Sequence, residues 1–338
     1  MLDTKVTDWT SDRLGPKSET NYRSLRLSFV VFAVAASIVW LLLFDVYKSL
    51  PYVQNGAAAV GQIKWSAAQS SELFAPADRI RVLAFGNSQI LAGFRPAAFD
   101  AAAGADVAAY NLSIPGDDKF LDLLEAALSN GNVPTHVFLQ FLPQSPDESV
   151  LALLRDNNRI VKWLFPFRNF VRDAVIFLFE SREGGGLVAQ YKSNAAQVRQ
   201  IVADRGYYFI KSESHYPGDR LPDDYALPTD RPGEVLKRTI DPSDPGFARL
   251  MRLADRYDFQ IVVVPVAFRR GAYAEPPDVD SDATAAMKPY PRVHVIGPAY
   301  WVYPVSQFSD PIHLNMRGAD RYSKDLARSF ADWLGSRR

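Results

Sequence analysis

The sequence predicts an α/β protein built on a flavodoxin-like, doubly wound, five-stranded parallel sheet, with one transmembrane helix near its N-terminus. From residue 81 onward, short apolar runs alternate with segments of helical length, a pattern typical of parallel sheets. The first of these runs ends abruptly in Gly86-Asn87-Ser88, as a strand does at a strand-to-helix corner. Far ahead of it, residues 27–44 form a run of 18 residues without a charge.

Composition limits the classes of function that the chain can have. With 338 residues, of which 48% are hydrophobic, the chain can bury the core of one large or two modest domains. Lys+Arg and Asp+Glu both number 38, so no net charge attracts nucleic acid, and we expect no nucleic-acid partner. The absence of cysteine excludes disulfides, thiol catalysis and Cys-ligated metal. We expect neither a cofactor nor a metal.

The uncharged run predicts a membrane-spanning signal anchor over residues 25–47. At ~1.5 Å per residue in a helix, it nearly matches the thickness of the hydrocarbon layer. A buried core helix would usually show a polar stripe, and none is visible. A cleaved signal peptide has a shorter apolar region, and the nearest stretch of small residues, 57–59, lies far beyond the run.

The flanking charges predict the orientation of the span. Five cations precede the span, namely Lys5, Arg13, Lys17, Arg23 and Arg26. Two follow it closely, Lys48 and Lys64. Residues 1–24 are therefore expected to be a cytoplasmic tail of a single-pass protein in a bacterial inner membrane. Residues 48–79 are expected to be a stalk or linker, with a stalk helix over 56–71, and residues 80–338 a periplasmic, extracytoplasmic domain.

The expected strands of this domain are residues 81–85, 107–112, 136–141, 260–266 and 293–296. The first two are followed by expected helices over 89–103 and 119–128. More than a hundred residues separate the third strand from the fourth, so we expect an insertion over about 146–239.

The first part of the insertion, residues 149–180, is helical in pattern and rich in aromatic residues. Arg168, Arg172 and Asp173 would sit in the middle of a bilayer, which disfavours a second span. We expect an amphipathic helix packed on the sheet, on the membrane surface or on a partner. Residues 184–186, three glycines, are expected to form a hinge or turn.

Ser88 lies where the first strand meets a helix, which suits a nucleophile. Parallel sheets place their chemistry at the carboxyl ends of strands, and a helix N-terminus there offers unpaired N–H groups to developing negative charge. Gly-Asn-Ser is equally good turn and helix-capping chemistry. The functional interpretation therefore requires a base for the serine.

Only four histidines are available. His136 opens the third strand at the amino edge of the sheet, His294 lies inside the fifth, and His215 lies in a polar loop. His313 instead follows Asp310 by three residues, on a loop expected to emerge after the fifth strand at the same edge as the serine. An aspartate in that position can accept the imidazole N–H and stabilise the imidazolium. The alternative is that both residues cap the last helix.

These two blocks together resemble the SGNH (GDSL-like) hydrolase superfamily. The resemblance is carried by Gly86-Asn87-Ser88 with Gly93-Phe94-x-Pro96, and by Asp310-Pro311-x-His313-Leu314-Asn315 with Gly318-Ala319. Among the branches of that superfamily, the sequence is most similar to membrane-anchored bacterial proteins of the DltD type and of exopolysaccharide acylation. The resemblance implies a Ser88, His313, Asp310 catalytic triad.

The resemblance also implies an oxyanion hole formed by Ser88, Gly116 and Gln144. Asn111 and Gly116 match the second block of the superfamily, although a strand-ending turn at Pro115-Gly116 explains them equally well. The third block departs from the usual Gly-x-Asn, because Gln144 stands at the offset of the asparagine. This departure argues against an ordinary secreted lipase or esterase.

The expected function is serine-dependent O-acyl transfer or ester hydrolysis, of acetyl groups above all, on a cell-envelope or extracellular polysaccharide. The resemblance implies a multi-pass membrane O-acyltransferase as partner, and the aromatic residues 163–179 offer a surface for it. The alternative is a non-catalytic assembly or polymer-binding subunit that kept the fold.

A reporter protein fused after Arg338 tests the predicted topology. Because the cations precede the span, the C-terminus is expected outside the cytoplasm, so an alkaline phosphatase fusion should be active and a cytoplasm-dependent fluorescent fusion dark. Fluorescence from the second fusion with an inactive phosphatase would contradict the orientation.

Overall fold

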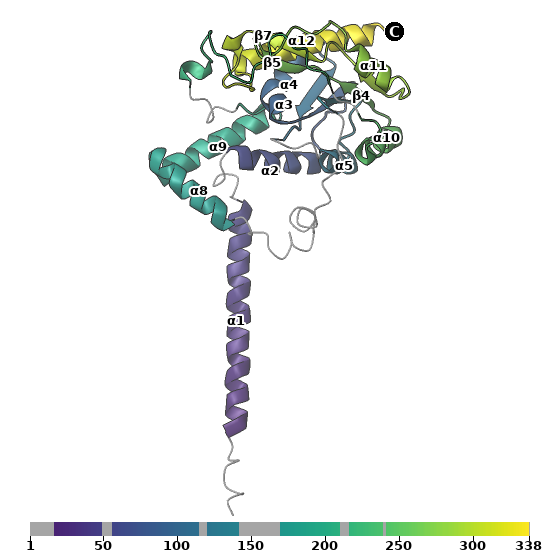
Figure 1. The fold of residues 1–338 in the computed structure, drawn as a ribbon. Helices are drawn as coiled ribbons and strands as arrows, with labels where there is room; N and C mark the ends of the chain where they lie inside the picture. The colour runs from purple at the N-terminus through teal and green to yellow at the C-terminus, as the bar shows by residue number, and fades with distance from the viewer. Residues whose placement is uncertain are drawn as a thin grey trace, which may run out of the picture.

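The computed structural model describes residues 17–48, 56–114, 120–141, 170–209, 216–238 and 241–337. An α/β domain stands at one end of a long N-terminal helix, α1 (Lys17–Lys48) (Figure 1). Within α1, Tyr22–Leu42 has a mean hydropathy of 2.2 and no buried side chain, so by length and composition it is able to cross a membrane.

The expected five-stranded parallel sheet is confirmed. Its strands are β1 (Ile80–Phe85), β2 (Val107–Asn111), β3 (His136–Leu139), β4 (Gln260–Val263) and β6 (Val293–Val295). They pair in parallel in the order β2-β1-β3-β4-β6. This is the strand order of flavodoxin-like doubly wound sheets, in which ligands bind beyond the carboxyl ends of the strands.

Helices cover both faces of the sheet because successive side chains of each strand point to opposite sides. Leu83 and Phe85 of β1 point to the face covered by α2 (Gly56–Gln69), α5 (Leu121–Ser129), α10 (Pro245–Tyr257) and α11 (Ser281–Met287). Val82 and Ala84 point to the face covered by α3 (Ser88–Gly93), α4 (Pro96–Ala103) and α12 (Met316–Gly335). Each face carries its own apolar core, so neither is open to solvent in the middle of the sheet.

Two expected elements are divided by prolines. The helix expected over residues 89–103 is broken into α3 and α4, because Pro96 disfavours helical backbone at Arg95, which is extended at φ −99° and ψ 105°. The fourth strand, expected over 260–266, ends at Val263, since Pro265 has no N–H to donate. After it the chain makes β5 (Val266–Arg269), which pairs in parallel with β7 (Tyr300–Tyr303) in a second small sheet.

The region between β3 and β4 contains helices, of which α8 (Phe170–Glu183) and α9 (Leu187–Ala203) precede α10. Three glycines join α8 to α9, and Gly185 and Gly186 have φ angles of 85° and 101°, which favour glycine. Short 3₁₀ turns lie at Pro217–Asp219 and Val305–Gln307. Most of the aromatic stretch expected to be helical, residues 149–169, lies outside the described residues.

The helix expected as a free stalk is instead part of the domain. Residues Gly56–Gln69 are helical, but α2 packs against α5 and α9, and Val60, Lys64 and Ala68 are fully buried. Lys64 Nζ donates hydrogen bonds to the backbone oxygen (2.8 Å) and side-chain oxygen (3.3 Å) of Asn111. Burial lowers the pKa of Lys64 well below its ordinary value.

Replacing Lys64 with methionine should change the pH dependence of stability. The unfolded chain carries a lysine with an ordinary pKa of about 10.4, and the folded chain one with a lower pKa. Between these values the unfolded state binds more protons, so the wild type becomes more stable as pH rises. The free energy of unfolding of the wild type minus that of Lys64→Met should therefore increase as the pH rises toward about 10 in denaturant titrations.

The matched control is Lys324→Met, because Lys324 is exposed on α12. Its difference from the wild type should stay flat over the same interval. A flat difference for Lys64→Met as well would show that this lysine is not buried in the folded chain.

Candidate functional site

Ser88 is the first residue of α3, immediately beyond the carboxyl end of β1. Asn87 caps this helix, since its side-chain oxygen accepts a hydrogen bond from the N–H of Gln89 at 2.9 Å. Gly86 makes the corner tight: a Cβ placed there would lie 2.7 Å from Ile90 Cγ1 and 3.1 Å from Gln140 Oε1. The serine is half-buried at the sheet edge where a nucleophile was predicted.

Asp310 and His313 form a buried pair on the loop before α12. Asp310 Oδ2 lies 2.6 Å from His313 Nδ1, and Asp310 Oδ1 accepts the backbone N–H groups of His313 (2.8 Å) and Ile312 (2.9 Å). Burial alone would raise the pKa of Asp310, but the hydrogen bond and charge of His313 and the two backbone N–H groups hold it below the ordinary value. The carboxylate therefore fixes the orientation of the imidazole.

The tautomer of His313 follows from this pair. An ionised carboxylate only accepts hydrogen bonds, so Nδ1 carries a proton, and in the neutral imidazole Nε2 is the acceptor. Nε2 is buried and, among the residues that the structure describes, has no hydrogen-bond partner. It is thus a proton acceptor with its lone pair unused, and no hydrogen bond joins it to Ser88 Oγ.

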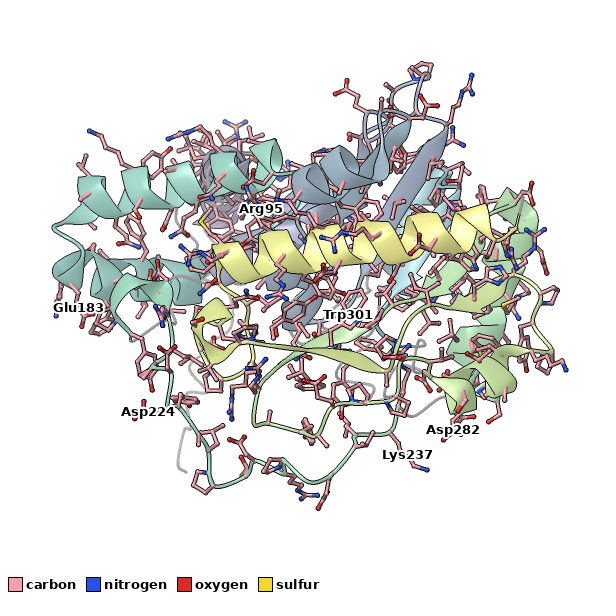
Figure 2. All side chains as sticks on the ribbon, turned by 90° about the horizontal axis from the view of Figure 1, so that it is seen from above. Arg95, Glu183, Asp224, Lys237, Asp282 and Trp301 are labelled. Carbon is pink, nitrogen blue, oxygen red and sulfur yellow. The ribbon has the colours of Figure 1, made fainter. Side chains whose placement is uncertain are left out.

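The two blocks that carry Ser88 and His313 lie side by side although more than two hundred residues separate them. A Cβ at Gly93 of α3 would touch Leu314 at 3.5 Å, next to His313. Ser323 Oγ of α12 donates to the backbone oxygen of Gly93 (3.3 Å) and accepts the N–H of Arg95 (2.8 Å). Arg95 lies beside α12 in Figure 2 and forms an ion pair with Asp320 at 2.6 Å.

The loop of His313 was predicted to follow the fifth strand of the sheet directly. In the structure it comes later in the chain. After β6 the chain first makes β7 and the 3₁₀ turn Val305–Gln307, and only then reaches Asp310. Asn315 ends the loop and caps α12 by accepting the N–H of Gly318 at 3.0 Å. A Cβ at Gly318 would lie 2.2 Å from the backbone oxygen of Gln307, so a glycine is required where the turn meets the helix.

Of the residues predicted for the oxyanion hole, Ser88 is described, whereas Gly116 and Gln144 lie outside the described residues. Asn111, which precedes Gly116, is fully buried and supports the corner. Its Nδ2 lies within hydrogen-bonding distance of the backbone oxygens of Ile90 (3.0 Å), Leu91 (3.3 Å) and Phe94 (2.8 Å). Asn111 therefore positions α3.

Gln140 is a polar residue at this corner that the sequence reasoning missed. It is 6% exposed, its Nε2 donates to Gln89 Oε1 at 3.0 Å, and its own Oε1 has no partner within the described part of the chain. A signal was present in the sequence, since Gln140 is a polar residue near the end of the apolar run expected as the third strand. The observed strand β3 ends at Leu139, so Gln140 lies directly after it.

A cavity of about 310 Å³ opens beside these two glutamines. Its wall includes Arg238, Phe268 and Tyr300, so the small second sheet forms one side of it. Arg238 is fixed, with its Nε 3.4 Å from an oxygen of Asp280 and its guanidinium donating to the backbone oxygen of Ala299 at 2.8 Å. Because Gln89 follows Ser88 in the chain, this cavity borders the corner.

Two other histidines lie away from this edge. His136 opens β3, and His294 in β6 contacts Trp333 near the C-terminal end of α12. Burial lowers the pKa of each to about 4. A larger cavity, about 610 Å³, lies beside His294 and Trp333 and is remote from Ser88. His215 lies outside the described residues.

Within the ranges that the structure describes, no group of three or more His, Asp or Glu side chains is placed to hold a metal ion. Comparisons of the chain with protein-family models, with curated proteins and with solved structures gave no match.

A serine-directed fluorophosphonate probe tests whether these residues act together. The wild type should be labelled and Ser88→Ala should not. Asp310→Asn should lose labelling rate on the order of 10⁴-fold, because an amide no longer selects the tautomer with a free Nε2. His313→Ala should lose a comparable amount.

His294→Ala is the matched control, because this histidine lies at the opposite end of α12. It should label at the wild-type rate. Full labelling of His313→Ala would contradict the assignment of His313 as the base.

Proposed function

We propose that the chain is a serine-dependent O-acyl transferase or esterase of the SGNH (GDSL-like) type that acts on acyl groups, acetyl above all, of a cell-envelope or extracellular polysaccharide. The observation that carries the proposal is the pair of Asp310 and His313, with Nε2 buried and unpartnered, on a loop packed beside the helix that begins with Ser88.

In the proposed reaction, Ser88 Oγ attacks the carbonyl carbon of the ester while His313 Nε2 takes the hydroxyl proton. The imidazolium that forms is stabilised by Asp310, which is already ionised and hydrogen-bonded to Nδ1. Collapse of the tetrahedral intermediate expels the alcohol, which takes the proton from Nε2. A second hydroxyl, from water or a sugar, then loses its proton to Nε2 and attacks the acyl-serine. Ser88 Oγ leaves with the proton from Nε2, which restores the serine hydroxyl and the neutral imidazole, and the acyl group stays on the oxygen of the second hydroxyl.

The negative charge on the carbonyl oxygen requires donors. The N–H of Ser88 at the start of α3 is one proposed donor, with Gly116 and Gln144 completing the set. Gln140 helps to hold the residues of the corner in place, since its amide donates a hydrogen bond to the side chain of Gln89, next to Ser88. The 310 Å³ cavity next to Gln89 offers room for one part of the substrate.

We further propose that α1 anchors the domain to the bacterial inner membrane, with its N-terminus cytoplasmic. A tethered domain meets membrane-delivered acyl donors at high effective concentration, whereas a scavenging esterase gains little from an anchor. This favours transfer to a polysaccharide alongside a multi-pass membrane O-acyltransferase. Hydrolysis of small esters is then a slow side reaction.

Deletion of the gene should lower acylation of an envelope polysaccharide, and the full chain in detergent should hydrolyse a small acetyl ester only slowly. Complementation with Ser88→Ala, His313→Ala or Asp310→Ala should restore little acylation. Gln144→Ala should be milder, at a loss of ~10²- to 10³-fold for one oxyanion donor of three.

Unchanged acylation in the deletion strain, together with fast ester hydrolysis, would replace the transferase with a free-standing esterase. Full complementation by Ser88→Ala would instead support the non-catalytic assembly or polymer-binding subunit. Immunoblots of each variant check that the protein accumulates to the wild-type level.

A further inference from the structure

A group of exposed apolar side chains lies on α8 and on the start of α9. Its members, named here the hairpin surface, are Val175, Ile176, Leu178, Phe179, Leu187 and Val188. Phe179 is 62% exposed and Val188 is 68% exposed. Single exposed apolar residues are common on proteins, but six on one helix pair joined by a tight glycine turn mark a contact surface.

The helices that carry the hairpin surface lie at the end of the domain toward α1 (Figure 1). In Figure 1, α8 and α9 occupy the end of the domain toward α1, whereas α11 and α12 lie at the far end. The chain permits little separation, because α1 ends at Lys48 and α2 begins at Gly56. Eight residue steps span at most about 28 Å. This limit keeps α2 close to the end of α1, and α9 packs against both α2 and α8. A membrane that holds α1 is therefore near the helix pair α8 and α9, as their place in Figure 1 shows.

From this placement we infer that the hairpin surface lies in the interfacial layer of the bilayer that α1 crosses, and so binds a lipid surface. The inference rests on the proposed spanning role of α1. It adds a second contact that sets the orientation of the domain on the membrane.

The chemistry of the hairpin suits shallow insertion. The apolar stretch of α8 is too short to cross a bilayer and is followed by Glu180, Arg182 and Glu183. The guanidinium of Arg182 lies 5.4 Å from the centre of the Phe179 ring, so a cation sits beside the apolar side chains, as it does where a basic group stays at the headgroup level. Apolar side chains of interfacial helices enter the membrane by about 5–10 Å.

The absence of cysteine from the chain makes a direct test possible. Val188→Cys carries one environment-sensitive fluorophore in the full chain, which is reconstituted in vesicles of phosphatidylethanolamine and phosphatidylglycerol. Val279→Cys is the matched control, a valine that is 61% exposed just before α11, at the end of the domain away from α1. Ser37→Cys, within α1, reports on the span itself.

We expect blue-shifted emission from position 188, and loss of that emission when lipids spin-labelled on the acyl chain are included. Position 279 should show neither effect, and position 37 should be quenched strongly. Quenching at 37 without quenching at 188 would overturn the inference and leave the span intact. No quenching at 37 would overturn both.

Two further outcomes identify another occupant and also overturn the inference. A blue shift at 188 that is insensitive to spin-labelled lipid, and that grows with the ratio of protein to lipid, would assign the hairpin surface to a second copy of the chain. A shift that appears only after detergent-solubilised membrane proteins are co-reconstituted would assign it to a protein partner. Triad activity is not part of the readout, so the result is independent of the proposed reaction.

Discussion

The side chain of Asn111 is the point on which the geometry of the Ser88 corner depends. Its Nδ2 lies within hydrogen-bonding distance of three backbone oxygens of α3 and of Phe94 just after it, and its oxygen accepts hydrogen bonds from the N–H of Ser113 and from Lys64 Nζ. A helix of six residues has few hydrogen bonds of its own, so contacts from outside help to hold it. Asn111 supplies a donor from β2 to backbone oxygens of α3 and of Phe94 just after it, and thereby fixes the direction in which α3 leaves the sheet.

The same residue brings distant parts of the chain together. Lys64 of α2 donates to the backbone oxygen of Asn111, and the backbone N–H of Asn111 donates to the backbone oxygen of Arg205. Gly206, at φ 89°, approaches so closely that a Cβ there would lie 2.0 Å from the oxygen of Asn111. Because these groups are buried, removing one leaves another polar group unsatisfied at a cost of about 1–3 kcal/mol. The corner therefore depends on elements that are far from it in sequence.

Patterns that are local in sequence predicted most of the fold. Features of the structure that depend on tertiary contacts were not predicted. The five strands follow from apolar runs bounded by turns, and the pair of Asp310 and His313 follows from a three-residue spacing that one carboxylate can bridge. The packing of the expected stalk helix against the domain was missed, because burial of Lys64 against Asn111, 47 residues away, leaves no periodic trace in an alanine-rich helix. The small second sheet was missed for a similar reason, since the pairing of β5 with β7 joins segments that read separately as loops. Gln140 was passed over because a single amide at a strand end has no distinctive spacing.

The position of α2 connects α1, which can cross a membrane, to the Ser88 corner. It is the first described element after α1, and it also carries the lysine that holds Asn111. A chain that crosses the bilayer with α1 therefore limits the distance of α2 from the membrane, and α9, which packs on α2, connects α2 to α8. Two contacts at different points restrain rotation of a domain more than one contact does. Insertion of the hairpin surface would thus hold the carboxyl edge of the sheet, with Ser88 and His313, at a constant angle to the bilayer.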